Sequence, residues 1–337
     1  MMCPRQKHGR GGLDRRAFIK GSVAGLIGLP ALKFSGGRAT ASTQTSKVAL
    51  IRTDDRIAGI KEALELFDFA PVSGKQVYIK PNLNTADPTP GCTHNDTLSE
   101  LVKAVHDRGA KKVTVGDRSG PQPTAEVLAE KGLPDMAREL DFELLNFSEL
   151  PQSDWMPQNP EGSHWKDGFM FVRQALESEY TISTCCLKTH GFGGVFTLSL
   201  KLSVGLVPRE QMRELHGSPD MRRMIAEINT VYQPELIVLD GIEAFVDKGP
   251  MEGPRKTANV FLAGRDRVAV DAVGVAILKE LGSNPAIMET KIFEQEQIKR
   301  AAELGLGIGS PDQIEFITAD REAQLYADKL KSILAEG

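Results

Sequence analysis

The sequence predicts an α/β protein in which a mainly parallel sheet carries helices on both faces. Short apolar runs rich in β-branched residues alternate along the chain with longer segments whose apolar residues recur at helical spacing. The apolar runs show little alternation of polar and apolar residues, which is typical of parallel strands buried on both faces. Repeated alternation of strand and helix favours a parallel sheet between two helical layers.

The expected elements follow one another from Lys47 to the C-terminus. Strands are expected at Lys47–Ile51, Gln76–Ile79, Lys112–Val115, Phe142–Leu145, Tyr180–Cys186, Glu235–Leu239, Asn259–Ala263 and Gln313–Ile317. Helices are expected at Arg56–Phe67, Thr97–Arg108, Thr124–Lys131, Pro134–Leu140, Met221–Tyr232, Val268–Leu281, Glu289–Leu304 and Arg321–Ala335. The first helix has apolar residues along one face, and Gly109 stops the second. Residues 151–168, rich in Pro, Gln and Asn, are expected to form a loop suited to a flap.

The N-terminal segment has the features of an export signal. Residues 14–20 read DRRAFIK, a mildly apolar and glycine-rich run follows, and Ala39-Thr40-Ala41 fits a small-residue cleavage site. This pattern resembles a twin-arginine (Tat) signal, which implies contact with the twin-arginine translocase, removal near Ala41 and a periplasmic protein. Residues 1–41 are therefore expected to be the signal and residues 42–337 a single domain. The apolar run is too short for a stable membrane anchor, which needs roughly 20 apolar residues.

The charge balance argues against some partners. Residues 1–41 hold eight of the 41 Lys and Arg residues and one of the 45 Asp and Glu residues, so the chain from Ser42 carries 33 basic and 44 acidic residues, a formal charge of −11. Nucleic acid and anionic membranes attract basic proteins, so neither is expected as a partner. A local group of lysines can still bind a small anion.

Cysteine spacing gives no self-contained iron–sulfur cluster motif. Cys92, Cys185 and Cys186 remain after the signal, and none of them lies in a C-x-x-C pair. Buried packing is the expected role of the adjacent pair. A bridge from Cys92 to either of the other two stays open in an oxidising compartment.

Polar side chains stand where the expected strands end, and this pattern points to a ligand site. Ligands of open α/β sheets bind outside the carboxyl ends of the strands. The expected ligand-binding residues are Lys80, Asn82, Asp117, Lys188, Gly193, Gly194, Lys201 and Asp240. The lysines suit a carboxylate or phosphate, and the glycines let backbone N–H groups approach an anion. Asp266 is expected to cap the helix that follows it, and a structural role is preferred for Asp271.

Two histidines near these lysines are the candidates for acid–base chemistry. His190 follows Lys188 at the end of its strand, and His216 lies in a connection further on. For His216, a plain surface position is the competing interpretation. No P-loop, Rossmann fingerprint, diagnostic nucleophile–base spacing or metal triad accompanies the histidines. The residues therefore leave enzyme and binding protein both open, and the metal and cofactor unknown.

A family resemblance joins most of these positions. The shared motifs are KPNL at 80–83, LKTH at 187–190, SLK at 199–201, GLVP at 205–208, HG at 216–217, IN at 228–229, PEL at 234–236, DGI at 240–242, GP at 249–250 with Gly253, and DRVAVDA at 266–272. In this order they resemble the domain-of-unknown-function family 362 (DUF362), over roughly Gln76–Leu281. The family has no agreed activity. Many members carry an appended ferredoxin-like segment with four-cysteine motifs, which is not found here.

The sequence thus predicts an exported DUF362-like protein that binds a small anionic ligand or cofactor at the strand-end edge of its sheet. Asp117, Asp240 and Asp271 are available to hold a metal or orient a hydroxyl. The alternative is a non-catalytic binding or redox-accessory protein that presents a ligand to a partner, related to the iron–sulfur members but without their cluster motifs.

Overall fold

The computed structural model describes residues 45–67, 69 and 71–337. The expected signal, residues 1–41, lies outside these residues, and so does its cleavage site. Within the described part, no helix is both long enough and apolar enough to cross a membrane.

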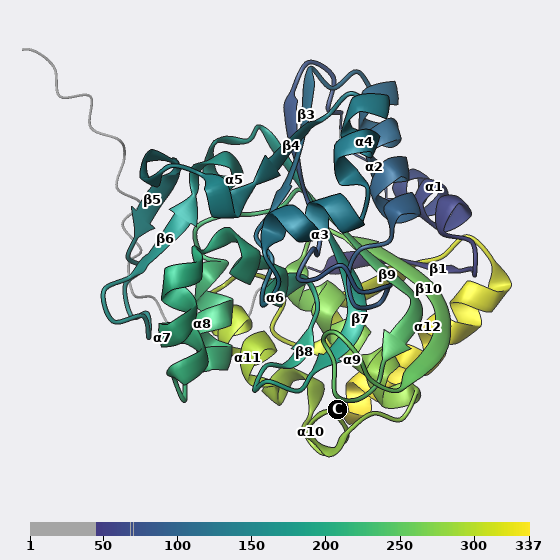
Figure 1. Cartoon of the computed structure of the whole chain (residues 1–337). Helices are drawn as coiled ribbons and strands as arrows, with labels where there is room; N and C mark the ends of the chain where they lie inside the picture. The colour runs from purple at the N-terminus through teal and green to yellow at the C-terminus, as the bar shows by residue number, and fades with distance from the viewer. Residues whose placement is uncertain (1–44, 68, 70) are drawn as a thin grey trace, which may run out of the picture. The chain divides into compact units, whose positions relative to one another are not determined.

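A nine-stranded sheet forms the centre of the fold, in the order β11-β1-β10-β9-β7-β2-β3-β4, with β8 paired to β7 (Figure 1). The strands are β1 (Ser46–Arg52), β2 (Gln76–Lys80), β3 (Lys112–Asp117), β4 (Glu143–Asn146), β7 (Tyr180–His190), β8 (Val195–Thr197), β9 (Leu236–Phe245), β10 (Arg255–Gly264) and β11 (Ile314–Ile317). From β9 to β4 all neighbours on the main path run parallel, whereas β10 is antiparallel to both β9 and β1. The expected α/β class with a mainly parallel sheet is confirmed.

Helices cover both faces of this sheet. The α-helices of the described chain are α1 (Arg56–Leu66), α2 (Asn95–Asp107), α3 (Thr124–Glu130), α4 (Leu133–Glu139), α5 (Arg173–Glu177), α6 (Ser199–Leu202), α7 (Met212–Gly217), α8 (Met221–Ile228), α9 (Arg267–Glu280), α10 (Pro285–Met288), α11 (Glu296–Glu303) and α12 (Arg321–Glu336). One apolar cluster joins α1 and α2 to the sheet, and another joins α9, α11 and α12 to the opposite face. The middle of α9 is buried all round because α12, α11 and α6 pack on it as well as the sheet.

The expected flap is instead part of a small folded unit. Trp155–Gln158 (β5) and Phe169–Val172 (β6) pair antiparallel, and their aromatic residues join a third apolar cluster with α7 and α8. Trp165, between the two strands, is buried there and donates its indole N–H to the carbonyl of Met224 at 3.2 Å. The polar composition of residues 151–168 hid these two tryptophan anchors, whose burial holds the segment in place.

Two strands are longer than the sequence predicts. β7 continues through Lys188 to His190 because β8 folds back and pairs with its last residues. β9 runs past Asp240 to Phe245, with a register shift against β7 between Cys186 and Leu187. Both extensions change which side chains lie at the strand-end edge of the sheet.

Candidate functional site

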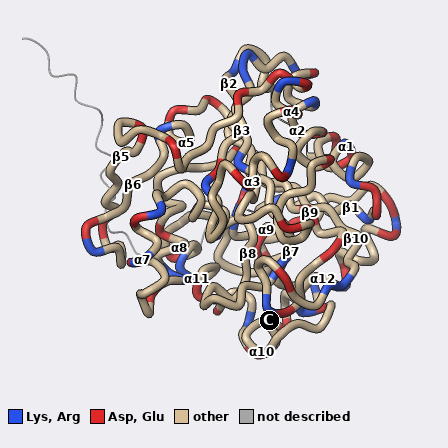
Figure 2. The backbone as a smooth tube through the Cα atoms, viewed as in Figure 1, with Lys and Arg blue, Asp and Glu red and all other residues tan. Residues whose placement is uncertain are grey.

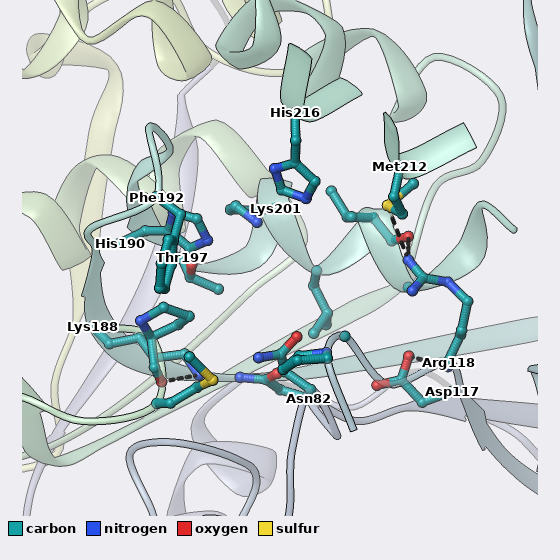
Figure 3. Close-up of a pocket in the computed structure, with 18 of the residues that line it drawn as sticks. Asn82, Asp117, Arg118, Lys188, His190, Phe192, Thr197, Lys201, Met212 and His216 are labelled. Atoms are coloured by element: carbon teal, nitrogen blue, oxygen red, sulfur yellow. Dashed lines mark hydrogen bonds between the residues drawn. The ribbon is translucent and has the colours of Figure 1, made fainter. Parts of the chain in front are cut away.

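A cavity of about 590 Å³ opens where β2, β3 and β7 end (Figure 3). These three strands are neighbours in the order β7-β2-β3 and run parallel, so their carboxyl ends meet at one edge. The lining residues are Lys80, Asn82, Asn84, Asp117, Arg118, Gly120, Pro121, Lys188, His190, Phe192, Thr197, Lys201, Leu202, Val204, Gly205, Arg209, Met212, His216, Pro250 and Met251. The structure therefore brings together the three lysines, Asp117, Asn82 and both histidines of the predicted site.

Lys80 and Asp117 form a buried ion pair on the cavity wall. The Lys80 Nζ lies 2.7 Å from Asp117 Oδ1, and both side chains are almost fully buried. Asp117 also accepts the backbone N–H groups of Leu83 at 2.8 Å and Arg118 at 2.7 Å. Burial lowers the pKa of Lys80, and the negative charge of Asp117 opposes that effect. The one carboxylate among the lining residues is thus already neutralised.

Arg118 fixes the backbone beside the cavity. Its guanidinium donates to the carbonyls of Val207 at 2.7 Å, Val204 at 2.9 Å and Ser119 at 2.9 Å. Burial lowers the pKa of Arg118 to about 10, so the group stays charged at neutral pH. Its hydrogen bonds go to these carbonyl groups and to the Met212 sulfur, and the negative charges of Asp117 and Glu210 act on it from nearby. The sequence analysis missed this residue, although it directly follows Asp117.

Lys188 is buried and holds two loops. Its amine donates to the carbonyls of Gly91, in the loop after β2, and Pro250, in the loop after β9. Burial lowers its pKa. Lys188 is one of the ligand-binding residues expected from the sequence, and the hydrogen bonds of its amine go to the loops that wall the cavity. Lys188 is itself one of the lining residues, so its positive charge lies at the cavity.

His190 is held as a neutral ring. Its Nδ1 accepts the backbone N–H of Gly194 at 3.2 Å, which leaves the ring proton on Nε2. Burial, and then the positive charges of Lys201 and Lys188, lower the pKa of His190 to about 2. Gly193 adopts a positive φ of 83° in this turn. Neither Gly193 nor Gly194 lines the cavity, so the backbone N–H donors expected there are not among its lining groups. The N–H of Gly194 instead orients the ring of His190.

Lys201 on α6 is the lysine whose amine is free. It is 8% exposed and lines the cavity, and in residues 45–67, 69 and 71–337 its amine has no hydrogen-bond or ion-pair partner. Burial lowers its pKa to about 7, and the positive charges of Lys188 and Arg118 act in the same direction. Figure 3 shows the amine between the rings of His190 and His216.

The position of Lys201 depends on Asp271 of α9. The Asp271 carboxylate accepts the backbone N–H groups of Ser199 at 2.7 Å and Leu200 at 3.0 Å, at the start of α6. Burial raises the pKa of Asp271 to about 7. The structural role preferred from the sequence fits this geometry, as does that of Asp266, whose carboxylate accepts the N–H of Ala269 at the start of α9.

Three further polar groups face the cavity. His216 on α7 is exposed, as the competing interpretation from the sequence had it, and desolvation followed by the positive charges of Lys201 and Arg118 lowers its pKa. The Asn82 Nδ2 and Thr197 Oγ1 atoms are buried, and neither has a hydrogen-bond partner in the described part of the chain. Buried polar atoms are normally bonded, so these two are candidates for ligand contacts. Thr197 was not foreseen, because the sequence does not reveal that β8 pairs with β7.

Asp240 is not part of this site. Its Oδ2 accepts from Arg56 Nε at 3.0 Å and Thr97 Oγ1 at 2.9 Å, on the side of the sheet that α1 and α2 cover. The expectation that it gathers with the lysines fails because β9 does not end at this residue. Asp240 is a buried link between the sheet and these helices.

Metal-binding features are scarce in the described residues. No group of three or more His, Cys, Asp or Glu side chains there is arranged to hold a metal ion. Cys92, Cys185 and Cys186 are buried and free, so the bridge left open by the sequence is not formed. The Cys92 Sγ instead donates to the carbonyl of Asp87 at 2.7 Å.

The charge of the cavity differs from that of the chain. Blue and red segments are interspersed over the backbone in Figure 2, in line with the acidic overall balance. The lining includes five lysines and arginines (Lys80, Arg118, Lys188, Lys201 and Arg209) and one carboxylate, Asp117. An excess of positive charge in a partly enclosed site attracts anions.

Comparison with protein families finds a family model that covers the cavity. The family model described as "Domain of unknown function (DUF362)" matches residues 77–276. The chain belongs to this family. Every residue that lines the cavity falls within the matched DUF362 region.

Two known proteins illustrate the relationship. The thylakoid-associated protein sll1697 of Synechocystis sp. is 26% identical over 251 residues, which cover 72% of this chain and 74% of that protein. Among solved structures, the lactate racemase apoprotein from Thermoanaerobacterium thermosaccharolyticum aligns with a TM-score of 0.46 and 12% identity, over 84% of this chain and 85% of that one. At that score the second likeness carries no functional argument.

Proposed function

We propose that this DUF362 protein binds a small carboxylate- or phosphate-bearing molecule in the cavity at the ends of β2, β3 and β7. The observation that carries the proposal is the Lys201 amine, which belongs to a residue only 8% exposed, lines the cavity and has no partner in the described residues. An ammonium group without a protein partner in a partly enclosed cavity loses part of its hydration, and a bound anion offsets that cost.

The neighbours of Lys201 support an anionic ligand. The Asn82 amide and the Thr197 hydroxyl are unbonded in the described chain, and the neutral His190 presents its Nε2–H. These groups are able to donate hydrogen bonds to carboxylate or phosphate oxygens. The volume of about 590 Å³ lies in the range of roughly 300–1,000 Å³ usual for small-molecule sites.

If the protein is an enzyme, His216 suits an acid–base role better than His190. The Nδ1 of His190 already accepts a hydrogen bond and its pKa is lowered to about 2, so it remains a neutral donor at physiological pH. His216 is more exposed and its ring nitrogens make no such hydrogen bond in the described residues, so its ring is open to a substrate.

A thermal-shift screen of organic acids, inorganic phosphate and divalent metals tests this proposal. Anions that bind should raise the melting temperature of the wild type by mass action, and less so at high salt. Lys201→Met should abolish the response. Lys61→Met, at a side chain that is 65% exposed, is the matched control and should keep it. If no anion stabilises the wild type, or if Lys201→Met responds equally, the proposal fails.

The competing function is a non-catalytic protein that presents its ligand to a partner. Phe192, at the cavity, is 61% exposed and packs edge-on against His190, with ring centroids 5.9 Å apart. An exposed aromatic residue beside a binding site is typical of a protein-contact position. If this function is correct, Phe192→Ala retains anion binding in the thermal-shift assay but loses the partner in a pull-down from the periplasm.

We further propose that the chain is exported in folded form by the twin-arginine route and acts in the periplasm. The motif over residues 14–20 and the small residues before Ser42 support this location.

A further inference from the structure

We propose that Lys201 is a carbonyl-reactive amine that forms a reversible imine with a small anionic aldehyde or 2-oxo acid in the cavity, a proposal that rests on the anion site proposed for the same cavity. The class of ligand is thereby narrowed from any small anion to one with a carbonyl group next to its charge.

The surroundings of the Lys201 amine are those of a reactive lysine. The side chain comes from α6, whose start is fixed by Asp271. Its aliphatic part packs against the turn after β7. The packing there is close, because a methyl group added to Gly194 would lie only 2.9 Å from Lys201 Cε and 2.8 Å from His190 Nδ1. The stem is held by packing while the amine faces the cavity. Most buried lysines have carbonyl or carboxylate partners, as Lys80 and Lys188 have here.

The charges around Lys201 favour the free amine. Lys188 and His190 face it from β7, Arg118 from the end of β3 and His216 from α7, and none of them is an acid. Asp117, the carboxylate in the lining, is paired with Lys80. With a pKa of about 7, an appreciable fraction of Lys201 is unprotonated at neutral pH, whereas an ordinary lysine, of pKa about 10.4, is almost entirely an ammonium ion.

The reaction needs no further reactant. The lone pair of the amine attacks the carbonyl carbon, and the electrons of the C=O double bond move to oxygen. His216, neutral because its pKa is lowered, accepts a proton from the new C–N centre. It returns this proton to the alkoxide oxygen, which gives the neutral carbinolamine. The remaining nitrogen proton then passes through His216 to the same hydroxyl group, which leaves as water while the nitrogen lone pair forms the C=N bond of the imine. The Nε2–H of His190 is a donor available to the developing oxyanion.

Trapping with glyoxylate tests the proposal on the whole mature protein. Sodium cyanoborohydride reduces an imine with glyoxylate to a carboxymethyl-lysine, which peptide mass spectrometry locates. At pH 7 and limiting glyoxylate, Lys201 should be modified faster than the exposed Lys61, on the order of tenfold or more. This comparison is made within one wild-type molecule, so it does not depend on a variant that folds.

Glycolate, which replaces the aldehyde of glyoxylate by an alcohol, separates this proposal from the anion site. Both compounds should raise the melting temperature, but only glyoxylate with cyanoborohydride should label Lys201, and Lys201→Arg should remove the label. If both ligands stabilise the protein and Lys201 is labelled no faster than Lys61, the imine proposal is wrong and the anion site stands. If neither compound nor any other anion stabilises the protein and Lys201 is not labelled, both proposals fail.

Discussion

The Lys80 amine lies 2.7 Å from the Asp117 carboxylate, and both groups are buried in the wall of the same cavity. The positive charge of Lys80 neutralises Asp117, which is the carboxylate among the lining residues. Lys201, in the same cavity, is left without an acid partner in the described chain. The two lysines therefore have different roles: Lys80 stabilises the fold, and Lys201 is available to a ligand.

Lys80→Met should destabilise the protein by about 3–5 kcal/mol, because it leaves Asp117 charged and buried without its partner. Urea unfolding of the mature chain measures this loss. Lys112→Met is the control, since its ion pair with Glu143 joins side chains that are 49% and 42% exposed. Such a surface pair contributes about 0–1 kcal/mol. Equal losses in the two variants would contradict the structural role of Lys80.

The sequence was sufficient to predict the sheet edge at which the cavity opens. Lys80 and Asp117 follow apolar runs rich in β-branched residues. Because the carboxyl ends of parallel strands meet at one edge of a sheet, residues at these positions are expected to lie close together. The same rule failed for Asp240, because where a strand ends depends on its neighbours. β10 pairs with β9 beyond Asp240 and carries the strand to Phe245, and no local pattern in the sequence encodes that pairing.

The sequence does not show which lysine amines have hydrogen-bond partners in the folded protein. Lys188 and Lys201 look alike in the sequence, yet Lys188 binds two loop carbonyls, whereas Lys201 has no partner in the described residues. The loops that supply those carbonyls, at Gly91 and Pro250, lie 97 and 62 positions from Lys188 along the chain. Contacts of this kind arise only when the tertiary fold is complete, so the free amine is visible only in the structure.

Lys201 should give the ligand-free protein a distinct dependence of stability on pH. Its pKa is about 7 in the folded protein and about 10.4 when unfolded. Between these two pH values the unfolded chain binds a proton that the folded chain does not, so the contribution of Lys201 to the free energy of unfolding rises with pH. Below about pH 7 the amine is charged in both states, and the full cost of burying that charge is present. Lys201→Met removes that cost. The variant should therefore melt higher than wild type at pH 6, and the difference should shrink as the pH approaches 10.

Thermal melts in buffers without small carboxylates or phosphate measure the difference in melting temperature between Lys201→Met and wild type. The other titrating groups are the same in both proteins, so their effects largely cancel in this difference. Lys61→Met, at an exposed position, should differ from wild type by a constant small amount across the same range. A gap between Lys201→Met and wild type that does not change with pH would show that Lys201 titrates as an ordinary lysine.

Replacement of Arg15 and Arg16 by lysine should block export. The paired arginines are the characteristic feature of the signal that residues 14–20 resemble, and lysine keeps their charge. The uncleaved precursor should accumulate in the cytoplasm, as measured by fractionation and immunoblotting. Lys7→Arg, outside the motif, should be exported normally. Normal export of the double variant would overturn the proposed location.

Gly205→Ala should damage the Lys80–Asp117 pair without altering the charge of the site. A Cβ at position 205 would lie 2.2 Å from Asp117 Oδ1 and 2.9 Å from Lys80 Nζ. Because these contacts are too close, one side chain must move, and such overpacking costs about 1–3 kcal/mol. Gly217→Ala is the control, since nothing lies within 4 Å of its Cβ position. It should leave stability unchanged or slightly increased.

A double-mutant cycle separates the steric effect at Gly205 from a backbone effect. The φ of Gly205 is not in the left-handed region, so alanine suits its backbone, and the clash with Asp117 is the expected source of the cost. In an Asp117→Ala background the closest contact is absent, and the remaining ones are with the end of the Lys80 side chain, which is then free to move. Gly205→Ala should therefore cost less there than in the wild type. Additive losses in urea unfolding would place the cost in the backbone of residues 203–206 instead. A clear coupling would mean that Gly205 is required because the ion pair occupies the space where a side chain would lie.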